Sequence, residues 1–283
     1  MALQREVCLV TDSTADIPPS LAEELGIVVV PLNVTIEGET FLDGSIPMSE
    51  FYRRMAAAAN LPTTSQPAVG AWIDAFRSAL DRYAQVICVT VSSKLSGTHE
   101  SAAAAVQQIG ERIHLFDSLS LSWGEGYQVV RAARAALAGA AVDEVKRTLE
   151  QARSAMNMIV GVNSLENLAK GGRVSKTVAV LGGILNVKVL LTIGGDGSLA
   201  PQHRTRGTTA ALEATVDWLA KRIDPGRPVD VGVLHAELPD AAAWLEERVR
   251  ERFAVRELLT IETGPVIGTH AGTAWGLAAA QTD

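Results

Sequence analysis

Short apolar runs that are rich in valine and isoleucine alternate with longer amphipathic stretches along this chain. The runs are too short for helices and have the composition of strands. Strands that alternate with helices are typical of parallel βαβ units, whose crossovers are right-handed. The pattern therefore predicts an α/β fold that begins with a doubly wound parallel sheet. The predicted strands cover residues 7–10, 28–31, 86–91, 113–116, 158–162, 187–193, 229–235 and 255–262.

The stretches between these runs carry apolar residues at helical spacing. After Gly97, alanine, valine and isoleucine recur at the i, i+3, i+4 and i+7 positions of a half-buried helix. Leu212, Val216 and Leu219 repeat this spacing later in the chain, and so do residues 245–253. We also expect helices over residues 69–80 and 142–156 and an alanine-rich helix at the C-terminal end.

The second half of the chain has a different pattern. Residues 186–193 and 198–204 flank the sequence Gly-Gly-Asp-Gly, which supplies the turn of a β-hairpin. A hairpin followed by helix, strand, helix and strand predicts an α+β domain with a mixed sheet. The chain of 283 residues is long enough for two modest domains. We place a Rossmann-like α/β domain at 1–155 and the α+β domain at 156–283.

Composition excludes several classes of protein. The chain is 47% hydrophobic and 20% charged, as expected for a globular protein, and its net charge of −7 disfavours nucleic acid. Cys8 and Cys88 lie in apolar runs, and no cysteine–histidine spacing is typical of a zinc site. No apolar run approaches the roughly 20 residues that span a bilayer. We expect a cytoplasmic protein, a monomer, without metal or cofactor.

Residues 12–16 (Asp-Ser-Thr-Ala-Asp) directly follow the first predicted strand. Ligands of doubly wound sheets bind beyond the carboxyl ends of the strands, where this segment lies. Asp16 precedes Pro18, so we interpret it as the N-cap of a helix. For Asp12 and Ser13, capping and ligand contact both stay open.

Residues 62–67 (Pro-Thr-Thr-Ser-Gln-Pro) place three hydroxyl groups between two prolines. Proline stiffens the backbone, so Thr63, Thr64 and Ser65 could be preorganised to donate hydrogen bonds to one acceptor. The alternative is a solvent-exposed loop that caps the helix over residues 69–80. Composition alone does not separate these two interpretations.

Residues 92–98 (Ser-Ser-Lys-Leu-Ser-Gly-Thr) connect a predicted strand to a predicted helix. The first amides of a helix carry the positive end of its dipole and bind anions well. Gly97 lets a ligand approach the backbone, and Ser93, Ser96 and Thr98 add hydroxyl groups. The segment is not a P-loop, because it lacks that motif's glycine and lysine spacing. Simple capping by Ser96 is the alternative, and capping can coexist with ligand binding.

Two glycine-rich segments present single basic side chains. Residues 170–173 (Lys-Gly-Gly-Arg) place Arg173 after a turn, where its guanidinium suits a carboxylate or a phosphate. Residues 264–272 frame His270 with glycines near the expected start of the terminal helix. Arginine at a surface turn and a structural histidine are the commoner cases. Together with the hydroxyl groups, these residues favour a carboxylate-binding site over a catalytic one, and the apolar strands could enclose an acyl chain.

These five motifs, in this order and over nearly the full length, resemble the DegV family of fatty-acid-binding proteins. The resemblance implies two α/β domains with one long-chain fatty acid between or beneath them and its carboxylate near the surface. It implies that Thr64 and Ser96 hydrogen-bond the carboxylate and that Thr63, Ser65 and the Gly97 amide lie close by. Thr98, Gly268 and Thr269 belong to the same implied binding site. The motifs are VTDSTAD at 10–16, TTSQP at 63–67, SSKLSGT at 92–98, KGGR at 170–173 and GPVIGTH at 264–270.

The resemblance also implies a partner. Such proteins present the fatty acid to an ATP-dependent fatty acid kinase, which makes an acyl phosphate, so catalysis belongs to the partner. Arg173 and His270 would lie beside the carboxylate, and we expect them to assist phosphoryl transfer more than fatty-acid affinity. Acyl-chain exchange through lid motion at a membrane surface would add a transient membrane contact.

The sequence departs from the family pattern in places. Residues 271–274 (Ala-Gly-Thr-Ala) replace the usual Thr-Gly-Pro-Gly, Val189 replaces a proline after Lys188, and Ala68 replaces a serine. None of these changes removes a hydroxyl group that we assign to the carboxylate.

Two other functions stay open. One is a stand-alone acyl hydrolase or transferase that uses Ser96 and His270, which turnover of an acyl ester by the purified chain would support. The other is a lipid-sensing or sequestering protein without a kinase. The gene of an ATP-dependent partner nearby would count against that function.

Overall fold

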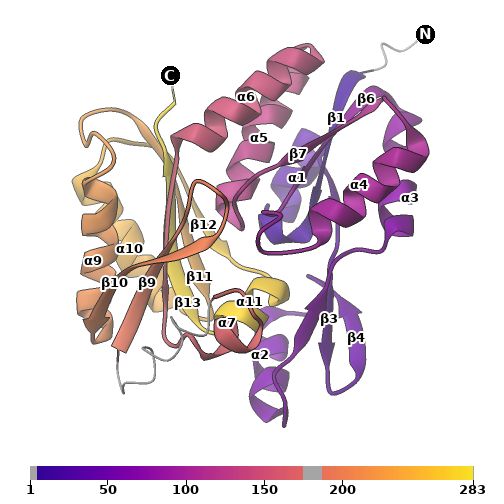
Figure 1. The fold of residues 1–283 in the computed structure, drawn as a ribbon. Helices are drawn as coiled ribbons and strands as arrows, with labels where there is room; N and C mark the ends of the chain where they lie inside the picture. The colour runs from indigo at the N-terminus through magenta and orange to yellow at the C-terminus, as the bar shows by residue number, and fades with distance from the viewer. Residues whose placement is uncertain (1–4, 175–186, 283) are drawn as a thin grey trace. The chain divides into compact units, whose positions relative to one another are not determined.

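The computed structural model describes residues 5–174 and 187–282 (Figure 1). The chain divides into two compact units. Unit 1 comprises Met1–Asn33 and Ser65–Ser154, and unit 2 comprises Val34–Thr64 and Ala155–Asp283. The segment 34–64 therefore groups with the C-terminal half, which a single division between residues 155 and 156 does not foresee. The two-domain division at that position stays a prediction.

A parallel four-stranded sheet forms the centre of unit 1, with the strand order β2-β1-β6-β7. This sheet confirms the predicted doubly wound fold class. Val86, Ile87, Cys88 and Val89 of β6 are fully buried, as expected for a parallel strand covered on both faces. The strands are β1 (Arg5–Asp12), β2 (Val28–Val30), β6 (Tyr83–Thr90) and β7 (Ile113–Asp117).

Helices cover both faces of this sheet (Figure 1). α3 and α4 pack together on one face, and α5 packs on the other beside α1. Trp72 and Phe76 of α3 are fully buried, with ring centroids 5.7 Å apart. The bounds of α3 are those predicted from the sequence. The elements are η1 (Ser13–Ala15), a short 3-10 helix, and α1 (Pro19–Leu25), α3 (Val69–Leu80), α4 (Thr98–Ile109), α5 (Trp123–Leu137) and α6 (Val142–Ala155).

A small three-stranded sheet with the order β4-β3-β5 was not predicted. Its strands are β3 (Asn33–Ile36), β4 (Glu39–Leu42) and β5 (Thr63–Ser65), and α2 (Met48–Ala57) lies between β4 and β5 in the sequence. The hydroxyl-rich segment thus forms a short strand rather than a loop. No side chain of the described residues caps α3 at Ala68, so the capping interpretation of that segment is wrong.

A mixed six-stranded sheet, with the order β10-β9-β8-β13-β11-β12, forms the centre of unit 2. The β11–β12 pair is parallel and the other pairs are antiparallel, so the predicted mixed sheet is confirmed. The predicted hairpin joins β9 to β10, where Gly197 adopts a φ of 85°. The strands are β8 (Met156–Val162), β9 (Val187–Ile193), β10 (Leu199–Arg206), β11 (Val229–Ala236), β12 (Val255–Glu262) and β13 (Ala274–Ala280).

The alanine-rich C-terminal end forms β13, so the helix predicted there is wrong. All seven residues of β13 are buried, and they pair with β8 and β11 on either side. The small residues permit close packing, since a Cβ on Gly276 would lie 2.8 Å from the Ile159 carbonyl oxygen. Tertiary pairing here overrides the local preference of alanine for helix.

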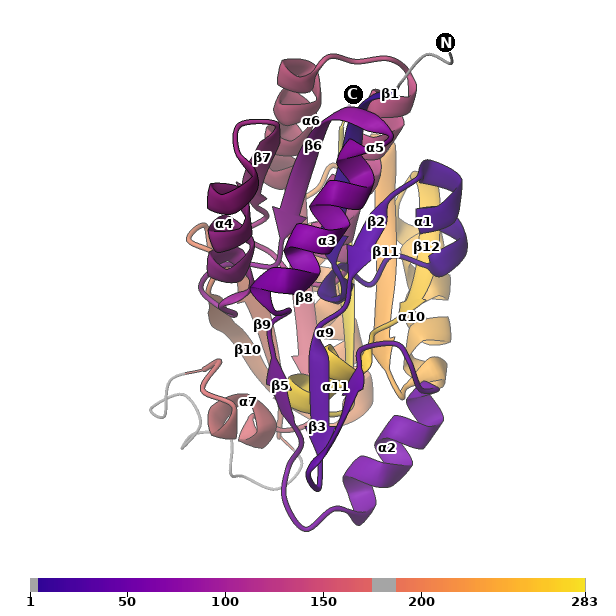
Figure 2. The same ribbon diagram turned by 90° about the vertical axis from the view of Figure 1, so that its right-hand side faces the viewer.

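The helices of unit 2 divide into two groups. α9 (Thr208–Ala220) and α10 (Pro239–Arg252) pack on the six-stranded sheet (Figure 1). The short helices α7 (Glu166–Lys170) and α11 (Pro265–Ala271) lie side by side (Figure 2). Throughout residues 5–174 and 187–282, no helix has the length and apolar character needed to cross a membrane.

Candidate functional site

The short strand β5 and the short helix α11 bring two predicted motifs together in unit 2. Thr64 Oγ1 lies 2.8 Å from His270 Nε2, although 206 residues separate them in the sequence. Both side chains are half-buried. Thr63, also in unit 2, is exposed. Thr64 and His270 therefore form a hydrogen-bonded pair that either ring tautomer can make.

Glycines allow α11 to pack closely around His270. A Cβ on Gly171 would lie 2.6 Å from His270 Nδ1, and one on Gly268 would lie 2.8 Å from the Tyr52 hydroxyl oxygen. Both positions therefore exclude larger side chains without rearrangement. The Thr269 hydroxyl group donates to the Pro265 carbonyl oxygen at 2.9 Å within the same helix. His270 thus lies at the end of α11, not before a following helix as the sequence led us to expect.

Burial determines the charge state of this site. Burial, and to a lesser extent the nearby Arg173 cation, lowers the pKa of His270 to about 4. At neutral pH the imidazole is therefore uncharged. The Nδ1 atom of His270 is buried and has no hydrogen-bond partner among the described residues. The site presents a neutral histidine beside a cationic arginine.

Arg173 follows the turn after α7. Its Nη1 donates to the Gly171 carbonyl oxygen, and its backbone amide donates to the Leu168 carbonyl oxygen at 2.9 Å. Gly172 adopts a φ of 76°, which favours glycine. Burial lowers the pKa of the guanidinium, which nevertheless keeps its charge at neutral pH. The turn therefore fixes Arg173 close enough to His270 to act on its protonation.

The loop that departs from the family pattern is held by hydrogen bonds. The Tyr52 hydroxyl group donates to the Gly272 carbonyl oxygen at 3.1 Å, and Asn163 Nδ2 donates to Thr273 Oγ1 at 2.5 Å. Lys188 Nζ in turn donates to Asn163 Oδ1 at 2.6 Å. Ala271 ends α11 and Ala274 begins β13, so the substituted residues form a short connection between two ordered elements.

The second group of predicted site residues lies in unit 1, at the start of α4. Ser96 Oγ lies 2.8 Å from Thr98 Oγ1 and accepts a hydrogen bond from the Thr98 amide at 3.3 Å. A Cβ on Gly97 would lie 3.2 Å from Gln66 Nε2, so glycine admits the Gln66 side chain against the backbone. Ser65 belongs to this unit too and accepts from Asn33 Nδ2 at 3.4 Å. The N-cap of α4 is Gly97, without a side-chain cap among the described residues, so the interpretation of Ser96 as the simple cap of this helix is wrong.

Of the two aspartates in residues 12–16, Asp12 caps the short helix η1, one of the two roles left open for it, whereas Asp16 differs from its predicted role. Asp16 does not cap α1; it adopts a φ of 49° and accepts from the Ser122 hydroxyl group at 2.6 Å. Asp12, which the sequence left open, is fully buried and accepts from the Val91 amide at 2.8 Å. Sequence reasoning missed its buried neighbour Glu125, for which a Gly-Glu-Gly run was the only signal.

No metal or thiol chemistry is indicated in the described ranges. They contain no group of three or more histidine, cysteine, aspartate or glutamate residues that could hold a metal ion. Cys8 and Cys88 are buried, and burial raises the pKa of Cys8 to about 11, which keeps the thiol protonated. Both cysteines therefore act as small hydrophobic residues, as predicted.

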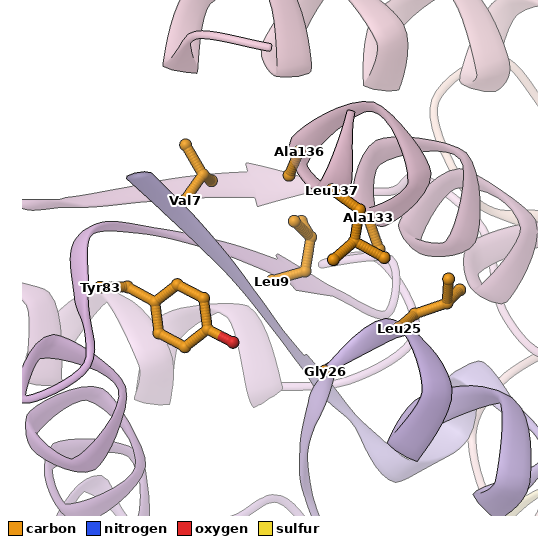
Figure 3. A pocket seen from close by; sticks show the side chains of 8 residues that line it. All are labelled: Val7, Leu9, Leu25, Gly26, Tyr83, Ala133, Ala136 and Leu137. Atoms are coloured by element: carbon orange, nitrogen blue, oxygen red, sulfur yellow. The ribbon is translucent and has the colours of Figure 1, made fainter. Parts of the chain in front are cut away.

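A small pocket lies in unit 1, and none of the predicted site residues lines it (Figure 3). It holds about 10 Å³, close to the smallest volume that admits one water molecule. Such a space does not accommodate an acyl chain. Its lining consists of Val7, Leu9, Leu25, Gly26, Tyr83, Ala133, Ala136 and Leu137.

Comparison with known proteins relates the whole chain to one family. The profile described as "uncharacterised protein, DegV family" matches residues 6–282. A DegV domain-containing protein of Caldanaerobacter subterraneus subsp. tengcongensis is 34% identical over 269 residues, covering 94% of this chain and 95% of the relative.

Two solved structures share the fold over nearly the full length. A fatty acid-binding DegV family protein of Thermus thermophilus has a TM-score of 0.92 and 33% identity, covering 98% of this chain and 100% of that one. The Streptococcus pneumoniae fatty acid kinase B3 protein, loaded with linoleic acid, has a TM-score of 0.86 and 23% identity, covering 98% and 100%. At that identity, the second likeness shows the fold alone.

Proposed function

Because this chain belongs to the DegV family, we propose that it binds one long-chain fatty acid and presents the carboxyl group to a separate ATP-dependent kinase. The observation that carries the binding part is the full-length relationship to the fatty acid-binding Thermus thermophilus protein. The kinase part rests on the motifs in residues 170–173 and 264–270, with the Streptococcus pneumoniae kinase protein as a neighbour in fold.

In this proposal, neutral donors hold the carboxylate. Thr64 and Ser96 supply hydroxyl groups, and the Gly97 amide and the first turn of α4 supply backbone donors and the positive end of the helix dipole. The resemblance assigns five further residues to fatty-acid binding: Thr63, Ser65, Thr98, Gly268 and Thr269. Since the lowered pKa leaves His270 uncharged at neutral pH, its Nε2–H group can donate to Thr64 Oγ1. That hydrogen bond would direct the Thr64 hydroxyl proton toward the ligand.

Arg173 and His270 serve the transfer step in this proposal. An acyl phosphate carries more negative charge than the carboxylate, so a fixed guanidinium stabilises the product side more than the ground state. The imidazole contributes as a neutral hydrogen-bonding group, not as a cation. On the partner kinase, a carboxylate oxygen forms a bond to the γ-phosphorus of ATP while the bond from that phosphorus to the β–γ bridging oxygen breaks, and ADP leaves.

Native mass spectrometry of the freshly purified protein, followed by extraction under denaturing conditions, tests the binding part. We expect an added mass equal to one fatty acid per chain. A chain without added mass that stays unshifted after incubation with several fatty acids would reject the proposal. Ester turnover would then test Ser96 and His270 as an enzymatic site.

Matched variants test the roles of the hydroxyl groups. Thr64→Val keeps the shape of the side chain and removes one donor, and Ser96→Ala removes the other. Each loss of a hydrogen bond to a charged group should weaken binding by about 1.5–3 kcal/mol, measured by calorimetric titration. Ser93→Ala, at an exposed serine of the same loop, is the control and should leave the affinity unchanged.

The division of labour needs a separate measurement. With kinase and ATP present, Arg173→Ala should retain fatty acid but form less acyl phosphate per bound ligand. If this variant lost binding outright while transfer per bound ligand stayed at the wild-type level, the assignment of Arg173 to transfer would be rejected.

A further inference from the structure

Two carboxyl groups meet in the interior of unit 1. Asp12, at the end of β1, and Glu125, in the first turn of α5, are both 0% exposed, and the Thr14 hydroxyl oxygen lies 2.5 Å from Asp12 Oδ1 and 3.5 Å from Glu125 Oε2. Gly126 allows this approach, because a Cβ there would collide with the Ala15 carbonyl oxygen. A hydroxyl group has one proton to donate and a carboxylate only accepts, so Thr14 can hydrogen-bond both carboxyl groups only if one of them keeps a proton and donates it to the Thr14 oxygen.

The neighbouring donors show which group carries that proton. Asp12 Oδ1 accepts from the Thr14 amide at 3.0 Å and the Thr14 hydroxyl group at 2.5 Å, and Oδ2 accepts from the Val91 amide at 2.8 Å. Glu125 Oε1 accepts from the Thr11 hydroxyl group at 3.0 Å. Since donors favour the ionised form, Asp12 is the anion and Glu125 is the protonated partner.

The Val91 contact connects this pair to the proposed binding loop. Val91 directly follows β6 and precedes the loop that ends at Ser96. The Ser92 carbonyl oxygen accepts from the Leu95 amide at 2.9 Å and the Ser96 amide at 3.2 Å. Asp12 therefore fixes the start of the turn that presents the Ser96 hydroxyl group and the first turn of α4.

We propose that Asp12 and Glu125 are positioning residues that share one proton and hold the loop of residues 91–97 in its binding geometry. The link to the ligand rests on the proposed function, whereas the shared proton is a property of the chain alone. Removal of the proton would place a second negative charge in a fully buried site. Binding should therefore weaken when the pH rises far enough to ionise Glu125.

The charged groups around the pair favour this protonation state. Burial raises the pKa of Glu125, and the Asp12 and Asp16 carboxyl groups raise it further. Cys88, on β6, has a raised pKa because of burial and the same two acids, Asp12 and Glu125. At the end of β7, Asp117 is occupied by the Ser93 and Leu119 amides.

In the part of unit 1 that the structure describes, no basic side chain balances the negative charge of the Asp12–Glu125 pair. Arg153 of α6 donates to the Asp117 carbonyl oxygen, and within the described part of unit 1 no basic side chain pairs with Asp12 or Glu125. Glu23 and Glu24 of α1, which packs on α5, are exposed. The pair can therefore lower its charge only by keeping a proton.

The pH dependence has a definite sign. With a raised pKa, the folded chain keeps a proton that the unfolded chain releases above the ordinary glutamate pKa, so folding weakens as the pH rises. The unfolding constant should increase by up to about tenfold per pH unit until the folded-state pKa is reached. Glu125→Gln removes this dependence, because its amide can donate to the Thr14 oxygen and accept from Thr11 without titrating.

The experiment compares urea unfolding of the wild type, Glu125→Gln and Glu150→Gln between pH 5 and 8. Glu150 is an exposed glutamate of α6 in the same unit. Relative to Glu125→Gln, the wild type and Glu150→Gln should both lose stability as the pH rises. If the free energy of unfolding changed with pH in the same way in all three proteins, the shared proton would be rejected. This experiment needs no ligand.

Fatty-acid titrations then test the positioning role. Glu125→Ala should weaken binding about tenfold or more, and Glu125→Gln should restore it and abolish the alkaline decline of affinity. Equal affinities of the wild type, Glu125→Ala and Asp12→Asn would overturn the role in binding. If Glu125→Ala does not fold, the pH profile of Glu125→Gln decides alone. If the wild type bound no fatty acid, the proposed function would be rejected. The unfolding curves would still test whether Asp12 and Glu125 share one proton.

Discussion

The Asp12–Glu125 pair of unit 1 and the Thr64–His270 pair of unit 2 are both shaped by burial, but in opposite directions. Burial raises the pKa of Glu125 and lowers the pKa of His270, so in both groups it favours the uncharged form. We call the Asp12–Glu125 pair closed, since each carboxyl group accepts hydrogen bonds from donors of the same unit. We call the Thr64–His270 pair open, since His270 Nδ1 has no hydrogen-bond partner among the described residues.

This difference separates a structural group from a candidate for chemistry. A fully satisfied buried network stabilises one local geometry and has little to offer a ligand. An incompletely satisfied group beside a cation stores interaction energy that a ligand or an approaching partner can use. Unit 1 therefore supplies positioning, and unit 2 supplies the groups that we assign to phosphoryl transfer.

The largest expected effect follows from removing Asp12 from the closed pair. Asp12→Ala leaves the buried Val91 and Thr14 amides without their acceptor, at about 1–3 kcal/mol for each amide, so the free energy of unfolding should fall by about 2–6 kcal/mol. Thr64→Ala removes one half-buried hydrogen bond and should cost about 1 kcal/mol. Urea unfolding at pH 7 measures both. Equal losses would contradict the contrast between a closed and an open pair.

The second prediction tests the Thr64–His270 pair by lowering the pH. Because the pKa of His270 is about 4 in the folded chain, the unfolded chain gains a proton first as the pH falls below the ordinary histidine value near 6.5. The folded state should therefore lose about 2–3 kcal/mol between pH 6.5 and 4, opposite in sign to the effect of Glu125. Urea unfolding across this range should show a steeper slope for the wild type than for His270→Gln.

His203 provides the control for this experiment. It is an exposed histidine on β10 of the same unit, so His203→Gln should keep the wild-type slope. If His270→Gln also kept that slope, His270 would titrate normally, and a neutral imidazole would no longer describe the site.

The third prediction displaces His270 without changing it. Gly171→Ala would place a Cβ 2.6 Å from His270 Nδ1 and 3.1 Å from the Asn167 carbonyl oxygen. The crowding should cost about 1–3 kcal/mol of stability and break the hydrogen bond to Thr64, which the histidine NMR signals would report. Gly195→Ala, with no atom within 4 Å of its Cβ, is the control and should be close to neutral. Unchanged histidine signals in Gly171→Ala would contradict the close packing.

The spacing of hydrophobic residues and the positions of proline and glycine predicted much of the fold. Helix α3 and strands β9 and β12 have the bounds expected from the sequence, since prolines, glycines and changes in hydrophobic spacing mark their ends. Strands β3, β4 and β5 escaped because three or four residues carry too little pattern. Strand β13 was mistaken for a helix because alanine favours helix locally and only its neighbours in the sheet decide otherwise.

The candidate site was predicted less completely, for a related reason. The motifs pointed to Thr64 and His270 separately, but only the fold shows their hydrogen bond. The sequence did not predict the burial of Glu125. A single acidic residue in a helix usually reaches solvent, and its burial depends on what packs against it. The roles of Thr63, Ser65, Ser96, Gly97, Thr98, Gly268 and Thr269 in binding stay predictions. The domain boundary at 155/156 stays one as well.

The smallest expected effect distinguishes a fixed cation from general positive charge. Lys170 belongs to the same motif as Arg173, but its ammonium group pairs with Glu166 at 2.6 Å, and the two side chains are 61% and 62% exposed. An exposed i,i+4 pair of this kind contributes about 0.3–0.5 kcal/mol, so Lys170→Ala should barely change stability.

Acyl phosphate formation per bound ligand should also be unchanged in Lys170→Ala. Arg173 differs because it is half-buried and close enough to His270 to lower the pKa of the ring. Charge alone, screened at an exposed position, would act through either residue and would weaken with added salt. If Lys170→Ala and Arg173→Ala reduced transfer equally, positive charge in general would attract the phosphate, and the fixed position of Arg173 near His270 would have no special part.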